Sequence, residues 1–148
     1  MRESLTVPSY IREKIIFVDT SAHYALINES DKNHKIARDF LDFAEKNNFR
    51  FITSNFILAE THALILKKSM LGYNFAKNFL IEARKSNKMP ERIKAEDEER
   101  AYQIIINYKD KDFTYTDATS FALMERLGIM KAFTFDQHFA QYGFEIVV

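Results

Sequence analysis

Four acidic side chains stand at positions where a carboxylate needs a partner. Asp19 directly follows the apolar run 15–18, and Asp136 follows the aromatic stretch 133–135. Glu60 and Asp117 fall inside predicted helices, three or four residues from apolar side chains that would face a core. A buried carboxylate requires a hydrogen-bond donor, a proton or a cation. One bound cation would satisfy all four acids.

The chemistry of these acids favours a hard divalent ion. Carboxylate oxygens suit Mg²⁺ or Mn²⁺, and the sequence contains no cysteine that would supply a thiolate. The 4 histidines are not at a zinc-like spacing from the acids, and we interpret them as surface or packing residues. A divalent ion lowers the pKa of a water and offsets charge on a phosphate. The pattern predicts metal-assisted phosphoryl transfer without a covalent nucleophile.

Each acid also has a simpler structural interpretation. Asp19 and Asp136 can cap the helices that follow them, and Thr116 with Asp117 can form a cap and an acidic first turn. Glu60 can pair with a basic side chain or lie in water at the rim of a helix. Capping explains each residue singly better than it explains the whole set, so we favour a shared site.

Alternating strand and helix patterns must position these acids. The strands are predicted at 14–18, 49–54, 131–135 and 144–148. The longer helices are predicted at 34–48, 56–68, 73–87, 95–110 and 116–128. This order indicates a single α/β domain with a mainly parallel central sheet, flanked by helices on both faces. Ligands of such sheets bind beyond the carboxyl ends of the strands, where Asp19 and Asp136 are expected.

Length and composition set the frame for this domain. A chain of 148 residues with 47% hydrophobic residues fits one globular unit, which we place at 14–148 behind a short N-terminal extension at 1–13. No run approaches the roughly 20 apolar residues of a membrane span, so we expect a cytoplasmic protein. A net charge of zero argues against general binding to polyanions but leaves room for a local basic patch.

Basic residues gather in the two helices predicted between residues 56 and 87. They alternate with aromatic side chains such as Tyr73, and such a surface can follow a phosphate backbone and stack unpaired bases. A solvated helix face is the other interpretation and is the usual one for charged runs. The candidate RNA-binding residues are Lys67, Lys68, Lys77, Arg84 and Lys85.

Four stretches together resemble a known family. FVDTSAHYAL, TSNFILAETHAL, DKDFTYTDATSFALMERLGI and AFTFDQHFAQYGFEIV occur in the order found in PIN-domain ribonucleases, and the chain is most similar to the VapC-like toxins. The resemblance makes 14–148 a PIN-like nuclease domain. It assigns catalysis and metal binding to one set of acids, with supporting hydroxyls beside the first and third. These acids are Asp19, Glu60, Asp117 and Asp136, and the hydroxyls belong to Ser21 and Thr116.

The resemblance also implies an activity and partners. It implies Mg²⁺- or Mn²⁺-dependent cleavage of single-stranded or loop RNA, leaving a 5′-phosphate and a 3′-hydroxyl. It further implies a homodimer and a cognate antitoxin. A host RNA-processing or quality-control nuclease and a non-catalytic binding module remain alternatives. A receiver domain would need a strand-end lysine, and a haloacid-dehalogenase-like phosphatase would need an aspartate where Ser21 stands.

Overall fold

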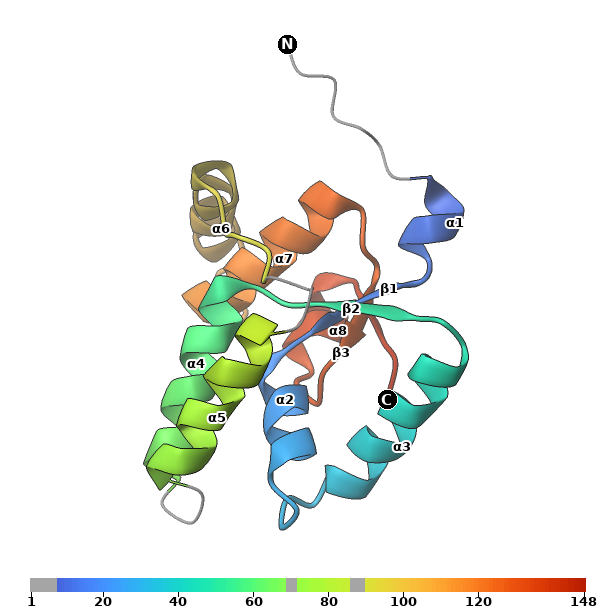
Figure 1. The fold of residues 1–148 in the computed structure, drawn as a ribbon. Helices are drawn as coiled ribbons and strands as arrows, with labels where there is room; N and C mark the ends of the chain where they lie inside the picture. The colour runs from blue at the N-terminus through green and yellow to red at the C-terminus, as the bar shows by residue number, and fades with distance from the viewer. Residues whose placement is uncertain (1–7, 69–71, 86–89) are drawn as a thin grey trace.

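A four-stranded parallel sheet forms the centre of the protein (Figure 1). The computed structural model describes residues 8–68, 72–85 and 90–148. The strands lie in the order β2-β1-β3-β4, and their carboxyl ends open at one edge of the sheet. The bounds are β1 Ile15–Val18, β2 Arg50–Ile52, β3 Lys131–Phe133 and β4 Glu145–Ile146. The predicted α/β class is therefore confirmed.

The helices occupy the segments between these strands. Their bounds are α1 Ser9–Arg12, α2 Thr20–Ile27, α3 His34–Lys46, α4 Asn55–Lys67, α5 Gly72–Lys85, α6 Ala95–Asn107, α7 Tyr115–Leu127 and α8 His138–Tyr142. The short helix α1 lies in the predicted N-terminal extension and was not foreseen. The last residues of the helix predicted at 73–87 lie outside the described ranges. None of the described helices is both long and apolar enough to cross a bilayer.

Alternate residues of β1 pack into two different hydrophobic cores. Ile16 and Val18 pack with α2 and α3 on one face, whereas Phe17 packs with α7 and α8 on the other. The Phe17 ring stacks on Phe139, with centroids 6.2 Å apart. Because β1 is buried on both faces, its sequence is continuously apolar up to Asp19.

Local signals fix the ends of the two helices that approach the carboxyl edge of the sheet. In α4, the Ser54 side chain accepts a hydrogen bond from Ile57 N at 3.1 Å. In α7, Thr114 Oγ1 accepts from Asp117 N at 3.0 Å, and Gly128 ends the helix with φ of 70°. These caps hold the first turns of α4 and α7 beside the strand ends.

A buried ion pair joins α7 to α6. The Asp97 side chain is 1% exposed and accepts hydrogen bonds from Arg126 Nε at 2.8 Å and Arg126 Nη2 at 2.9 Å. It also accepts from Lys94 N at 2.9 Å. Burial alone would raise the pKa of Asp97, but these hydrogen bonds and the neighbouring positive charges outweigh it and lower the pKa below its usual value. The ionised pair therefore helps to hold α7 in place.

We expect Asp97→Asn to destabilise the fold by about 2–3 kcal/mol, because it leaves the Arg126 charge without its partner. The melting temperature should fall by roughly 5–10 °C at pH 7. Since the folded-state pKa of Asp97 is lowered, its contribution is present above pH 4 and is lost as the pH falls through that pKa. Thermal melts from pH 7 down to pH 3 should show the difference narrowing.

Glu96→Gln is the matched control, because Glu96 lies 3.8 Å from Arg126 but its side chain is 66% exposed. Its melting temperature should stay close to the wild-type value. Equal effects of the two substitutions would contradict a specific role for Asp97.

Candidate active site

Asp19 stands at the end of β1 and is almost fully buried, with 5% exposure. Although it occupies the N-cap position of α2, its side chain makes no capping hydrogen bond to that helix. Instead, Asp19 Oδ2 accepts hydrogen bonds from Thr134 Oγ1 at 2.8 Å and from Ser21 Oγ at 3.3 Å. The capping interpretation therefore does not account for its orientation.

Burial makes the charge on this carboxylate expensive. It raises the pKa of Asp19 from 3.8 to about 6, partly offset by the hydrogen bond from Thr134. The negative charges of Asp117 and Glu60 contribute smaller increases to this value. Both acids thus lie close enough to Asp19 to repel its charge, which is the situation a bound cation would relieve.

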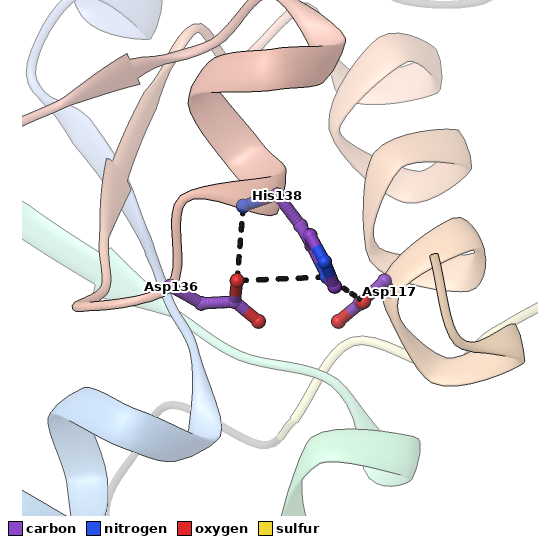
Figure 2. Close-up of side chains that lie close together, drawn as sticks. All are labelled: Asp117, Asp136 and His138. Carbon is purple, nitrogen blue, oxygen red and sulfur yellow. Dashed lines mark hydrogen bonds and ion pairs between the residues drawn. The ribbon is translucent and has the colours of Figure 1, made fainter. Parts of the chain in front are cut away.

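Asp117, Asp136 and His138 converge beside the sheet (Figure 2). His138 Nδ1 lies 2.8 Å from Asp117 Oδ2 and 3.5 Å from Asp136 Oδ1. Asp136 Oδ1 also accepts from the backbone N of His138 at 2.9 Å. One ligand atom from each residue falls within a group 4.8 Å across. The capping interpretation applies in part to both acids. Asp136 accepts from the first residue of α8, and Asp117 Oδ2 accepts from Thr114 N at 3.1 Å.

The sequence places His138 near Asp136 but assigns it no role, whereas the structure brings its ring close to both Asp117 and Asp136. Burial alone would lower the pKa of His138, but its hydrogen bond to Asp117 and the charges of Asp136, Asp117 and Asp112 outweigh it and raise the pKa. The sequence signal was weak. The spacing of two residues shows that His138 lies near Asp136, but its hydrogen bond to Asp117 joins residues that are 21 positions apart.

Glu60 corrects a second expectation. The sequence placed it on the inward face of α4, but its side chain is exposed. The buried face of α4 is formed by Ile57, Leu58, Thr61 and Ile65, which leaves Glu60 at the solvent edge of that face. Its effect on the pKa of Asp19 still places its charge near the other acids. An exposed carboxylate can turn toward a ligand from the solvent side.

The supporting hydroxyls are only partly those expected. Ser21 Oγ lies beside Asp19 and also accepts from Phe135 N at 2.9 Å. The hydroxyl that bonds the backbone of Asp117 belongs to Thr114, whereas Thr116 is half-buried and its carbonyl accepts from Thr119. Sequence reasoning missed Thr134, which is fully buried.

Thr134 links two of the acids. Its hydroxyl donates to Asp19 and accepts from Asp136 N at 3.0 Å, and it lies 3.1 Å from Ser21 Oγ. The hint in the sequence is a hydroxyl two residues before Asp136, directly after the strand next to β1. A single side chain therefore bridges the ends of β1 and β3.

The predicted basic residues do not form one continuous patch at the acids. Helices α4 and α5 form an antiparallel hairpin (Figure 1). Lys67 and Lys68 lie at the far end of α4, whereas Arg84 and Lys85 end α5 and return toward the start of α4. Lys77 lies between them, with its Nζ 5.6 Å from the centre of the Tyr73 ring.

The donor set fits a divalent metal ion. Ligand atoms of Asp117, Asp136 and His138 lie within 4.8 Å of one another. The buried carboxylate of Asp19, directly after β1, interacts electrostatically with Asp117. Carboxylates that raise one another's proton affinity lose that repulsion when a cation binds. Oxygen-rich sites of this kind suit Mg²⁺ or Mn²⁺, and an imidazole broadens the range toward other transition ions.

The sequence and the fold agree on the family. Residues 16–145 match the PIN domain family. The chain is 33% identical over 130 residues to the 23S rRNA-specific endonuclease VapC20 of Mycobacterium tuberculosis, from strains CDC 1551 / Oshkosh and H37Rv. The aligned region covers 88% of this chain and 95% of that relative. This protein therefore belongs to the PIN-domain family.

A solved structure has the same fold. The crystal structure of Mycobacterium tuberculosis VapC20, described as a sarcin-ricin loop cleaving toxin, matches with a TM-score of 0.78 and 31% sequence identity. The match covers 87% of this chain and 95% of that one. Both the sequence and the arrangement of elements are thus similar to a VapC-type endonuclease over most of their length.

We expect Asp19→Asn to stabilise the metal-free protein near neutral pH. The raised pKa of Asp19 means that the folded state loses stability as the pH rises from about 4 to 6, and the full penalty remains above pH 6. The neutral amide removes that penalty, up to about 3 kcal/mol, and can still accept from Thr134. Melts in chelator should show a gain at pH 7.5 that vanishes near pH 4.

The exposed residue Asp110, whose side chain is 78% accessible, supplies the control Asp110→Asn, which should change little. A lower melting temperature for Asp19→Asn than for wild type at pH 7.5 in chelator would show that Asp19 is not a destabilising charge.

Proposed function

We propose that this PIN-domain protein is a Mg²⁺- or Mn²⁺-dependent endoribonuclease of the VapC type, the toxin of a toxin–antitoxin pair. The observation that carries the proposal is the buried carboxylate of Asp19 at the end of β1, whose pKa is raised by burial and by the charges of Asp117 on α7 and Glu60 on α4. Such a cluster stabilises the fold poorly and is suited to holding a cation. Its similarity to VapC20 supports RNA as the substrate.

Asp19, Glu60 and Asp117 would hold the ion, with Asp136 completing the group or holding a water. When bound, the ion would lower the pKa of the attacking water and offset charge at the phosphate. Thr134 and Ser21 fix the orientation of Asp19 through their hydroxyls. Asp117 is fixed through its reciprocal hydrogen bonds with Thr114.

The remaining chemistry belongs to side chains around this cluster. A carboxylate that is not committed to the ion can accept the proton of the attacking water. Asp136 is suited to this role because it is half-buried and its Oδ2 makes no hydrogen bond among those described around the site. Attack of this water at phosphorus would break the bond to the 3′ oxygen, which would take up a proton from solvent, and would leave a 5′-phosphate and a 3′-hydroxyl.

The substrate class follows from the relatives. VapC20 is described as cutting 23S rRNA and the sarcin-ricin loop. A loop of large-subunit ribosomal RNA is therefore the first substrate we propose for this chain, and the cytoplasm is where it would act. A cognate antitoxin protein and a homodimer complete the proposal.

Asp117→Asn should abolish metal-dependent cleavage, reducing the rate by at least about a hundredfold, because it removes both a ligand charge and the partner of His138. The measurement exposes ribosomal RNA to purified protein with Mn²⁺, with Mg²⁺ and with chelator, and maps the new 5′ ends. Discrete cuts should disappear with chelator and with Asp117→Asn.

Asp110→Asn, on the exposed turn that precedes α7, is the control and should cut as the wild type does. Binding of Mn²⁺ should also raise the melting temperature of the wild-type protein. Cleavage that persists equally in Asp117→Asn would come from a contaminating nuclease and would leave the proposal without support.

Charge substitutions in the α4–α5 hairpin test how RNA reaches this site. Arg84 and Lys85 lie at the end of the hairpin nearer Glu60, whereas Lys67 lies seven residues beyond Glu60, about 10 Å further along α4. If RNA crosses the near end, Arg84→Glu with Lys85→Glu should raise KM by roughly tenfold and flatten its salt dependence.

Lys67→Glu with Lys68→Glu changes the net charge by the same amount at the far end and should have a smaller effect. Titrations of RNA at two salt concentrations provide the measurement. Equal losses from both pairs would indicate a general effect of net charge and would contradict a defined RNA path.

A further inference from the structure

We propose that Tyr115, supported by Phe56, is a stacking site for an unpaired base next to the bond that is cut. This inference rests on the proposed function and adds a feature of the substrate: a nucleotide whose base is free to leave its helix. It concerns two aromatic residues that belong neither to the predicted acidic site nor to the candidate RNA-binding residues of the α4–α5 hairpin.

The two rings meet at the start of two helices that carry the acids. Tyr115 is the first residue of α7, two before Asp117, and Phe56 lies in the first turn of α4, one turn before Glu60. Side chains four apart on a helix lie about 5–6 Å from each other at Cβ, so Phe56 and Glu60 share one side of α4. The ring centroids of Phe56 and Tyr115 are 6.2 Å apart, at 57° to each other.

Tyr115 is held in place although it is exposed. Its side chain and backbone together are 45% exposed, yet its hydroxyl donates to Glu98 Oε1 of α6 at 3.2 Å. The ring is thus fixed at its tip by α6 and along its side by Phe56 of α4. A fixed aromatic ring can stack on a ligand with little further loss of side-chain entropy.

The charges around Tyr115 favour a base over a phosphate. Glu98 holds its hydroxyl, and Glu60 and Asp117 lie on the same two helix starts. The Glu98 carboxylate, which takes no part in the proposed ion site, repels a phosphate placed over the ring but does not prevent stacking of a neutral base. Every base offers a face to an aromatic ring, so the site would require an unpaired nucleotide rather than a particular sequence.

Tyr10 offers an exposed ring in a different setting. It is 71% exposed and lies in α1, before the amino end of β1, whereas the acids lie at the carboxyl edge of the sheet. It therefore provides a matched control: Tyr10→Ala removes an exposed tyrosine ring without touching the proposed stacking site.

The test pairs variants of the protein with variants of the RNA. Once wild-type cuts are mapped, the same RNA is made with a single abasic nucleotide at each of the two positions on either side of the cut. For wild type, one of these substitutions should raise KM by roughly 5- to 100-fold with a smaller change in kcat. Tyr115→Ala should show a similar rise on intact RNA and little further response to the abasic nucleotide.

A binding readout separates stacking from catalysis. With 2-aminopurine at the sensitive position, RNA bound to Asp19→Asn should show quenched fluorescence, and adding Tyr115→Ala should remove the quenching. Tyr115→Phe keeps the ring and should retain the quenching, and Tyr10→Ala should also retain it. Melting temperatures of all variants confirm that each is folded.

The outcomes distinguish this inference from the proposed function. If wild type cuts no RNA, the proposed function fails first. If wild type cuts RNA but no abasic position discriminates it from Tyr115→Ala, the stacking site is wrong while the nuclease stands. Unchanged cleavage and quenching in Tyr115→Ala, combined with weaker binding of a protein inhibitor, would assign the rings to a protein partner and overturn the inference.

Discussion

The rest of the site depends on the placement of a carboxylate at the end of the central strand. Asp19 is buried, with 5% exposure, directly after β1, which is covered on both faces up to Val18. The hydrogen bond from Thr134 offsets the cost of burial only in part, and the pKa of Asp19 remains about 6. The protein thus keeps a poorly stabilised charge at the position where a cation would be most useful.

The surrounding elements are arranged to keep that charge in register with its neighbours. Parallel pairing places Val18 opposite Phe133, which brings Asp19 and the segment 134–136 to the same edge. The Asp97–Arg126 pair and the Thr114 cap then fix α7, the helix that carries Asp117. Polar contacts outside the site therefore determine its geometry as much as the hydrophobic cores do.

Much of this arrangement is readable from the sequence, for local reasons. Continuous apolar runs predict the buried strands, and helical spacing puts Asp117 on the packed side of α7, where it is 8% exposed. Glu60 was misplaced because α4 is apolar around much of its circumference, so spacing alone does not select the buried face. Thr134 and His138 were missed because their contacts cross 115 and 21 residues, and no local pattern encodes them.

The hairpin of α4 and α5 is attached in a different way from the rest of the domain. Ile57 of α4 belongs to the main core, but the one buried residue of α5 is Ala76, which packs in a small separate cluster with Tyr24 of α2 and Ile65 of α4. Regions with so few buried contacts open locally at a free energy below that of global unfolding. Amide hydrogens of α5 should therefore exchange with solvent well before those of α7, so the width of the approach to the acids can vary while the sheet that positions them stays intact.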